Sequence, residues 1–211
     1  MWLILAFCSA ALLGFYDVCK KHALSGNAVL PVLFLNTAIC SLLFLPFIIL
    51  SSYTGLLDSS SFYVEPCGWE QHRYILLKAC IVLSSWIFGY FAMKHLPITI
   101  VGPINATRPV MVLIGALLVF GERLNVWQWA GVTLAIISFF LLKRSGKKEG
   151  VDFRHNKWIF SLILAAVLGA VSGLYDKYLM APPENGGVGL SRMVVQSWYN
   201  LYQLAMMGLT M

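Results

Sequence analysis

Residues 3–17, LILAFCSAALLGFYD, recur 159 positions later as residues 162–176, LILAAVLGAVSGLYD. Eight of the fifteen positions are identical, including the closing Gly-x-Tyr-Asp. Both copies space small residues four apart, which lets helices approach closely in lipid. Self-similarity at a fixed offset indicates an internal repeat, and the alternative is that two apolar helices are alike by chance.

The composition predicts an all-α polytopic membrane protein. Of 211 residues, 59% are hydrophobic and 11% charged, against roughly 45–50% and 25% in soluble domains. Continuous apolar runs such as 42–50 and 110–120 disfavour a β-barrel, whose strands alternate. About 20 apolar residues cross a bilayer as a helix, and seven such segments are expected, at 2–19, 29–50, 74–96, 98–120, 126–142, 158–180 and 191–211.

The basic residues predict how these helices are oriented. Alternate loops on one side hold nine Lys and Arg, whereas the opposite loops hold three. Cytoplasmic loops carry the excess, so we expect the N-terminus outside and residues 143–157 in the cytoplasm of a multi-pass cell-membrane protein. The first segment has Lys20 and Lys21 after its apolar run, which argues for a retained span over a cleaved signal peptide.

The repeat also predicts the domain organisation. The two copies lie five spans apart, so they cross the membrane in opposite directions, as in inverted-repeat transporters. We expect a first repeat of five helices at 1–143, a basic linker at 144–157 and an incomplete second repeat of two helices at 158–211. The counterpart of the fifth helix would end near residue 301, so the chain is expected to lack about three spans of a five-plus-five fold.

Arg108 is the most costly residue in the predicted spans, because it lies at the centre of 98–120 and a mid-membrane guanidinium costs at least about 2.5 kcal/mol. Pro103 and Pro109 lack an N–H, so they interrupt the helix beside it. Broken helices with a midplane charge bind substrates in transporters. We therefore expect Arg108, Asn105 and Thr107 to bind substrate, and the alternative is that an acidic partner merely neutralises Arg108.

Aromatic and acidic residues supply the remaining candidates. Trp86 and Tyr90 share one helical face and could line the substrate cavity, although packing is the alternative. The repeated Tyr-Asp pairs are expected at opposite membrane faces as gates, and local pairing with Lys20, Lys21 or Lys177 is the alternative for their carboxylates. Lys78 is expected to snorkel to the outer interface. The gating candidates are Tyr16, Asp17, Tyr175 and Asp176.

Other chemistries receive little support from the sequence. The five cysteines include no Cys-x-x-Cys pair, and the four histidines lie in loops or at span ends, so no metal site, cofactor or disulfide framework is expected. No common catalytic motif is present, so we expect no enzyme, catalytic residue or nucleic-acid partner. The expected partners are the lipid bilayer and a small-molecule substrate, with a homodimer as one assembly allowed.

One part of the chain resembles a known family. A segment near the middle of the chain resembles the fourth and fifth helices of EamA-type members of the drug/metabolite transporter superfamily. The residues that carry the resemblance are Gly102-Pro103 through Pro109, Gly121-Glu122-Arg123-Leu124, Trp127-Gln128-Trp129 and Gly131. The resemblance implies ten helices in two inverted halves. The end at Met211 and the arginine inside the fourth helix depart from that pattern.

The sequence thus predicts a secondary transporter, an exporter or exchanger, that moves a small amino-acid-like or anionic metabolite by alternating access. The alternatives are a non-transporting scaffold or receptor and an inactive truncated carrier. A membrane enzyme would need convergent acid/base or metal-binding groups at one depth.

Overall fold

A computed structural model describes residues 2–121, 125–146 and 155–210. This part of the chain is almost entirely helical and contains no strand. Its helices are α1 (Trp2–Leu24), α2 (Val29–Tyr53), α3 (Trp69–His95), α4 (Ile98–Ala106), α5 (Arg108–Phe120), α6 (Val126–Gly146), α7 (Lys157–Met180), the short 3-10 helix η2 (Pro183–Asn185) and α8 (Arg192–Thr210).

The all-helical membrane fold predicted from the sequence is confirmed. By length and composition, four helical segments of the described residues could cross a membrane: α2, α3, the pair α4–α5 and α7. The helix ends differ from the predicted ones by a few residues. For example, α3 begins at Trp69 because the Gly68 N–H donates to the Gln71 side chain at 2.7 Å, which satisfies an otherwise unpaired group ahead of the helix.

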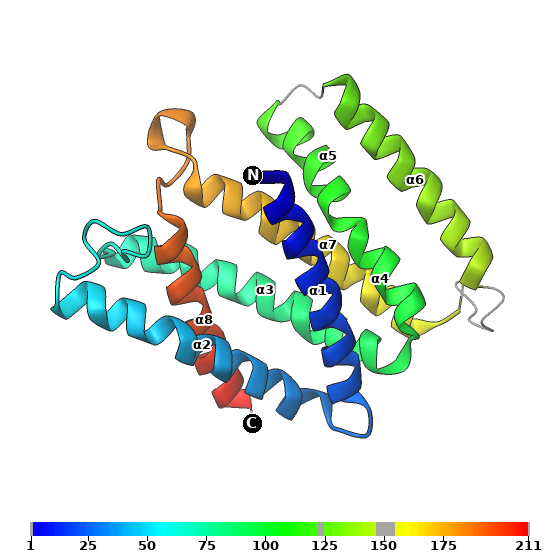
Figure 1. Ribbon diagram of the computed structural model, residues 1–211, viewed down its shortest axis with the longest axis horizontal. Helices are drawn as coiled ribbons and strands as arrows, with labels where there is room; N and C mark the ends of the chain where they lie inside the picture. The colour runs from blue at the N-terminus through cyan, green and yellow to red at the C-terminus, as the bar shows by residue number, and fades with distance from the viewer. Residues whose placement is uncertain (1, 122–124, 147–154, 211) are drawn as a thin grey trace.

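The helices pack around α3 and α7, which make the most extensive contact in the molecule. In Figure 1, α2 and α8 lie on one side of this pair and α5 and α6 on the other. The ends of α1 and α3 meet the start of α7 at one end of the molecule, here called the linker end. The end of α2, the start of α3 and the end of α7 lie at the opposite, far end.

Two buried clusters form the core. One lies toward the linker end and includes Leu33, Met93 and Leu162, while the other lies toward the far end and includes Ile75, Leu179 and Val194. Trp86 packs against both. The core is therefore continuous along α3, and Trp86 joins its two parts.

One hydrogen bond between α2 and α8 joins two residues that are separated by the offset of the sequence repeat. The Ser41 hydroxyl donates to the Asn200 backbone carbonyl at 2.8 Å, and these two positions are 159 apart. This separation equals the repeat offset. Equivalent positions come together only near the axis that relates two repeats, so the contact agrees with an inverted-repeat fold.

Small residues allow α5 and α3 to approach α7. A Cβ atom at Gly173 would lie 3.0 Å from a Val112 methyl carbon, and one at Gly115 would lie 2.4 Å from Leu174. On the other side of α7, the Ser85 hydroxyl donates to the Ala165 carbonyl at 2.7 Å. The predicted small-residue spacing therefore serves close packing of helix backbones.

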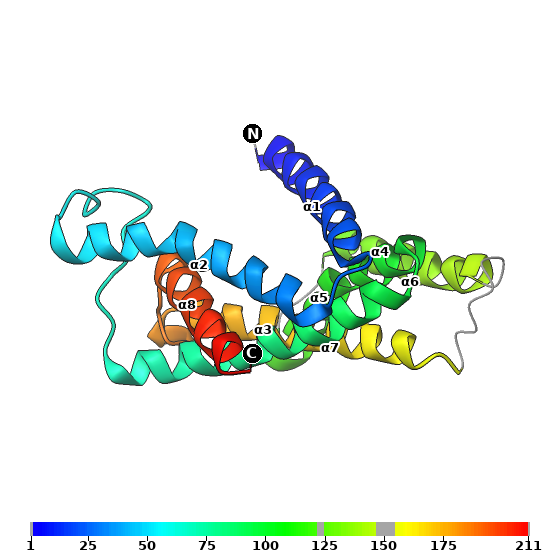
Figure 2. The same ribbon diagram turned by 90° about the horizontal axis from the view of Figure 1, so that it is seen from below.

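The first helix, α1, is attached mainly at its linker end. The Lys21 ammonium donates to the Met93 and Leu96 carbonyls at 2.6 and 2.8 Å, so it satisfies carbonyls at the end of α3 that have no helical partner. The preceding turns project away from the other helices, as Figure 2 shows. Phe7 and Leu12 are accordingly about 70% exposed in the isolated chain.

We predict that Gly173→Val destabilises the protein by about 1–3 kcal/mol, the usual cost of overpacking a close contact, because its side chain would meet Val112. Gly14→Val is the matched control, since a Cβ there would meet nothing within 4 Å. Unfolding in mixed micelles measures both variants, and equal stability of the two would contradict this packing.

Candidate functional site

The break between α4 and α5 positions the central arginine. The Thr107 N–H and hydroxyl both bond to the Ile104 carbonyl, at 3.1 and 2.7 Å, which tightens the last turn of α4. A new helix then begins at Arg108 with Pro109 in its first turn, where the missing N–H costs no hydrogen bond. The interruption expected from the prolines is therefore present, directly before Arg108.

The Arg108 side chain lies against the backbone of α7. A Cβ at Gly169 would be 3.1 Å from both Cζ and Nε of Arg108, so a larger residue there would crowd the guanidinium. Nε of Arg108 and Oδ1 of Asn105 are buried without a hydrogen-bond partner among the described residues. Both atoms remain able to bond to a bound molecule, and burial without a partner is costly.

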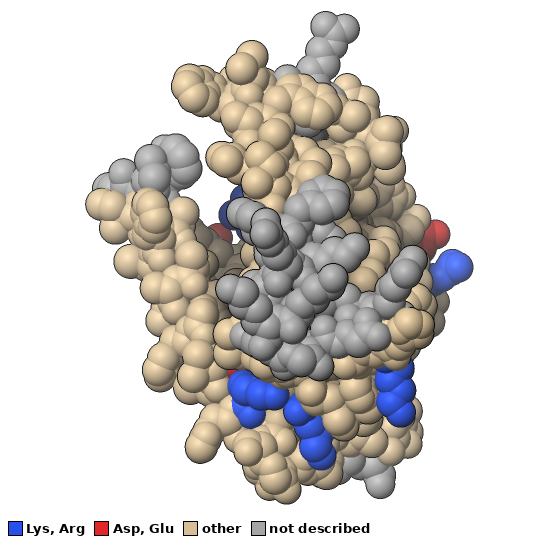
Figure 3. Space-filling model, turned by 90° about the vertical axis from the view of Figure 1, so that its right-hand side faces the viewer, with Lys and Arg blue, Asp and Glu red and all other residues tan. Residues whose placement is uncertain are grey.

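A cavity of about 650 Å³ lies between α1 and α2 and reaches Asn27 and Ala28 at the linker end. Its polar lining comes chiefly from Tyr16, Lys20 and Asn36, and Tyr90 of α3 closes one wall. The space-filling view in Figure 3 looks onto the linker end and shows a hollow between α1 and the other helices, with charged atoms inside it.

The tyrosines and the lysine in this cavity form a connected group. The Tyr16 and Tyr90 hydroxyls are 3.0 Å apart, and the Tyr16 hydroxyl is 3.5 Å from Oδ1 of Asn36. The Lys20 ammonium lies 4.7 and 5.2 Å from the Tyr16 and Tyr90 ring centroids, within the range of cation–π attraction. The group thus offers hydroxyl, amide and ammonium functions on one side of the cavity.

The charges of the site sum to one positive charge. Lys20 pairs with Asp17 at 2.8 Å, and Asp17 also interacts electrostatically with Arg108. One carboxylate thus lies near two cations. The sequence alone did not reveal that Asp17 interacts with Arg108, because Asp17 was assigned to the end of its span.

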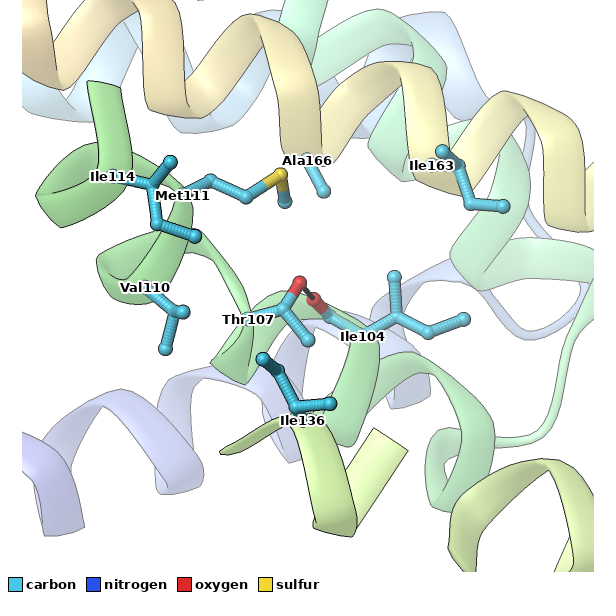
Figure 4. Close-up of a pocket in the computed structure, with 8 residues that line it drawn as sticks. All are labelled: Ile104, Thr107, Val110, Met111, Ile114, Ile136, Ile163 and Ala166. Carbon is cyan, nitrogen blue, oxygen red and sulfur yellow. Dashed lines mark hydrogen bonds between the residues drawn. The ribbon is translucent and has the colours of Figure 1, made fainter. Parts of the chain in front are cut away.

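The structure brings together some of the predicted site residues and separates others. Tyr90 and Tyr16 line the cavity with Lys20, whose ion-pair partner is Asp17. Arg108 and Asn105 are absent from the cavity lining, and Arg108 is linked to this group through its electrostatic interaction with Asp17. Thr107 instead lines a different cavity of about 300 Å³ whose other walls are apolar, and Figure 4 shows its hydroxyl bonded to Ile104. Trp86 lies in the core at the junction of the two buried clusters.

The predicted residues of the second repeat lie at the far end. Asp176 is paired with Lys78 of α3, which is only 4% exposed. The expectation that Lys78 snorkels to the interface is therefore wrong, because a carboxylate on the neighbouring helix stabilises its charge inside the protein. The Tyr175 hydroxyl donates to the Tyr74 carbonyl at 3.3 Å, so α3 and α7 are joined twice at this end.

Sequence reasoning missed Lys20 and Asn36 as residues of the cavity. Lys20 was considered as a topology signal and as a local partner of Asp17, but not as a cavity residue, although it lies four residues after Tyr16 and so on the same helical face. Asn36 is an amide within an otherwise apolar segment, a pattern that marks a polar interior face. No group of three His, Cys, Asp or Glu side chains that could hold a metal occurs in the described ranges.

These features define a class of helical membrane protein with a broken helix and a polar cavity beside it. The sequence pattern of the EamA-like transporter family matches residues 1–144, and the chain belongs to this family. It is also 24% identical over 84 residues to the "UDP-galactose transporter homolog 1" of Kluyveromyces lactis, a match that covers 38% of this chain and a quarter of that protein. No solved structure matches the chain.

We predict that Tyr16 and Tyr90 are energetically coupled through their hydroxyls. In a double-mutant cycle with Tyr16→Phe and Tyr90→Phe, the coupling should be about 0.5–1.5 kcal/mol, the net value of one hydrogen bond. Replacing Tyr16→Phe by Tyr53→Phe in the same cycle is the control, because Tyr53 is exposed and should be additive. Additivity of both cycles in micellar unfolding would exclude the contact.

Proposed function

We propose that this chain forms the substrate-binding part of a secondary transporter that moves a small organic anion by alternating access. The observation that carries the proposal is Arg108, whose buried Nε has no described partner. Its charge interacts with Asp17, the ion-pair partner of Lys20 in the wall of the cavity of about 650 Å³. Family membership and the helical membrane fold support transport as the process.

The net charge of the site favours a single negative charge on the cargo. Asp17 already pairs with Lys20, so Arg108 supplies the positive charge that remains. A guanidinium has donors in a fixed planar fork that matches a carboxylate or phosphate. A carboxylate bound there would accept from Arg108 and remove the cost of its buried, unpaired Nε.

Neighbouring groups would hold the rest of the cargo. The Tyr16 and Tyr90 hydroxyls can both donate and accept, and Asn36 and Asn105 each have a buried side-chain atom with no partner within the described part of the chain. An amino-acid-like cargo would place its carboxylate at Arg108 and its ammonium near these oxygens. Thr107 and Trp86 would act by positioning, through the helix break and the core.

Gating would involve the repeated Tyr-Asp pairs. At the far end, Lys78–Asp176 and Tyr175–Tyr74 join α3 to α7, which would close this side while the cavity reaches the linker end. Opening the far end would require these contacts to break as those around Tyr16 and Asp17 tighten. The structure leaves the exporter and exchanger modes equivalent in this scheme.

The name of the relative from Kluyveromyces lactis suggests a second candidate cargo, a nucleotide sugar, which is also an anion. The diphosphate of a nucleotide sugar carries two negative charges, whereas the site offers one net positive charge. We therefore place a singly charged organic acid ahead of a nucleotide sugar, and a direct comparison of the two decides the matter.

We predict that Arg108→Gln lowers anion flux at least tenfold while leaving insertion intact, since a hydrogen bond to a charged group contributes roughly 1.5–3 kcal/mol. The measurement is uptake into proteoliposomes of a labelled panel of monocarboxylates, amino acids and UDP-galactose. Arg73→Gln is the matched control, because Arg73 is exposed and lies at the far end.

Unchanged flux in Arg108→Gln would remove this residue from the cargo site. Saturable binding with no flux of any panel member would favour the scaffold or receptor instead. Preferential uptake of UDP-galactose would overturn the preference for a single charge.

A further inference from the structure

A second charged and aromatic cavity lies at the far end, outside the site described above. Its volume is about 450 Å³, and it lies between α7 and α8 with further walls from α2 and Phe62. Asp176, Arg192 and Gln196 supply its polar groups. Nothing in the proposed cargo site accounts for this combination.

Asp176 in the wall of this far-end cavity belongs to an ion pair with Lys78, whose side chain is buried while that of Asp176 is partly exposed. Lys78 of α3 donates to Asp176 of α7, and its ammonium lies 5.2 Å from the Tyr199 ring centroid on α8. The Tyr199 hydroxyl accepts from Nε2 of Gln196 at 3.1 Å. Three helices therefore fix these groups, and Tyr199 is only 9% exposed.

The far-end cavity corresponds to the linker-end cavity through the sequence repeat. Asp176 is the repeat counterpart of Asp17, and each cavity lies between the first two helices of its own repeat copy. Both aspartates pair with a lysine that faces a tyrosine ring. The two lysines come from different helices and are not repeat counterparts of each other. The two cavities therefore resemble each other in position and charge, but not in every residue.

The charges of the two cavities are also alike. Asp176 is matched by Lys78, and Arg192 adds one further positive charge at the cavity wall. Within the described ranges, no carboxylate forms a salt bridge with Arg192. The far-end cavity therefore carries one net positive charge, as the linker-end site does.

Aromatic rings give this cavity an apolar wall. Phe47 and Phe62 are stacked with their centroids 5.5 Å apart, and Phe44 lies 6.3 Å from Phe47. Offset aromatic pairs at such distances attract one another and accept a further ring. A ligand with one negative charge and an aromatic or branched apolar part would satisfy both sides of the cavity.

We propose that the far-end cavity is a second binding site for organic monoanions, with Arg192 binding the anionic group and Phe47 and Phe62 contacting the apolar part. The proposal rests on the proposed function in one respect, that the two sites take the same class of cargo. A carboxylate here would lie directly outside the Lys78–Asp176 pair, so a cargo molecule would occupy this site before or after that pair opens.

The test is calorimetric titration of the purified 211-residue protein in micelles with benzoate, an aromatic monoanion. Two saturable sites are expected, and Arg192→Gln should weaken one of them at least tenfold. Arg192→Lys should retain most of the affinity, because it keeps the charge. Arg73→Gln, an exposed arginine at the same end, should leave both sites unchanged.

Two further ligands distinguish the contribution of the negative charge to binding from that of the aromatic ring. Benzyl alcohol, which is neutral, should bind the far-end site at least tenfold more weakly than benzoate. Acetate lacks the ring, so Phe62→Leu should weaken benzoate binding several-fold and leave acetate binding unchanged. Equal affinity for benzoate and benzyl alcohol would overturn the proposal.

Arg108→Gln distinguishes failure of this proposal from failure of the proposed function. If Arg108→Gln removes all benzoate binding while Arg192→Gln and Arg73→Gln titrate alike, the far-end site is disproved and the cargo site stands. If Arg192→Gln weakens binding and Arg108→Gln changes neither binding nor flux, the far-end site stands and the proposed function fails. Absence of saturable benzoate binding at millimolar concentration overturns the far-end site.

Discussion

The placement of one guanidinium within a membrane-length helical segment constrains the structure around it. Arg108 needs a polar environment in a region that lipid cannot supply. The chain meets this need by ending α4 at Ala106, by placing glycine at position 169 where the side chain crosses α7, and by bringing Asp17 of α1 close enough to interact. The break between α4 and α5, the close contact of Arg108 with α7 and the position of α1 therefore all contribute to the polar environment of Arg108.

The packing of α3 against α7 supplies the rigid frame for this arrangement. From the middle of the pair to the linker end, the Ser85 and Ser161 hydroxyls donate to backbone carbonyls of the facing helix, and the His95 and Trp158 rings lie parallel. By contrast, α1 contacts α3 mainly near its end, through Lys21 and Tyr16. A rigid pair beside a sparsely attached helix permits relative motion, which alternating access requires.

Sequence patterns predicted the helices, the break beside Arg108 and the repeat, because each depends on local periodicity, on proline chemistry or on similarity at a fixed offset. They offered the local partner of Asp17, Lys20, as an alternative, and this pair is present, but they did not predict partners on other helices. Lys78 was expected at an interface, yet it meets a carboxylate 98 residues away on a neighbouring helix. Thr107 was grouped with Arg108 because the two are adjacent in sequence, yet residues one or two apart do not share a helix face, and Thr107 lines a different, apolar cavity.

The repeat explains why charged groups gather at two places and not one. In an inverted repeat, any feature near the end of the first helix of the repeat occurs at both ends of the molecule. Asp17 and Asp176 are such a feature. Each aspartate pairs with a lysine, and that lysine lies over a tyrosine ring. A carrier that alternates between two openings needs similar electrostatics at each, since a large difference in charge would trap an ion on one side. In the proposed carrier, the equal net charge of the two cavities would avoid such a trap, although the surrounding side chains differ.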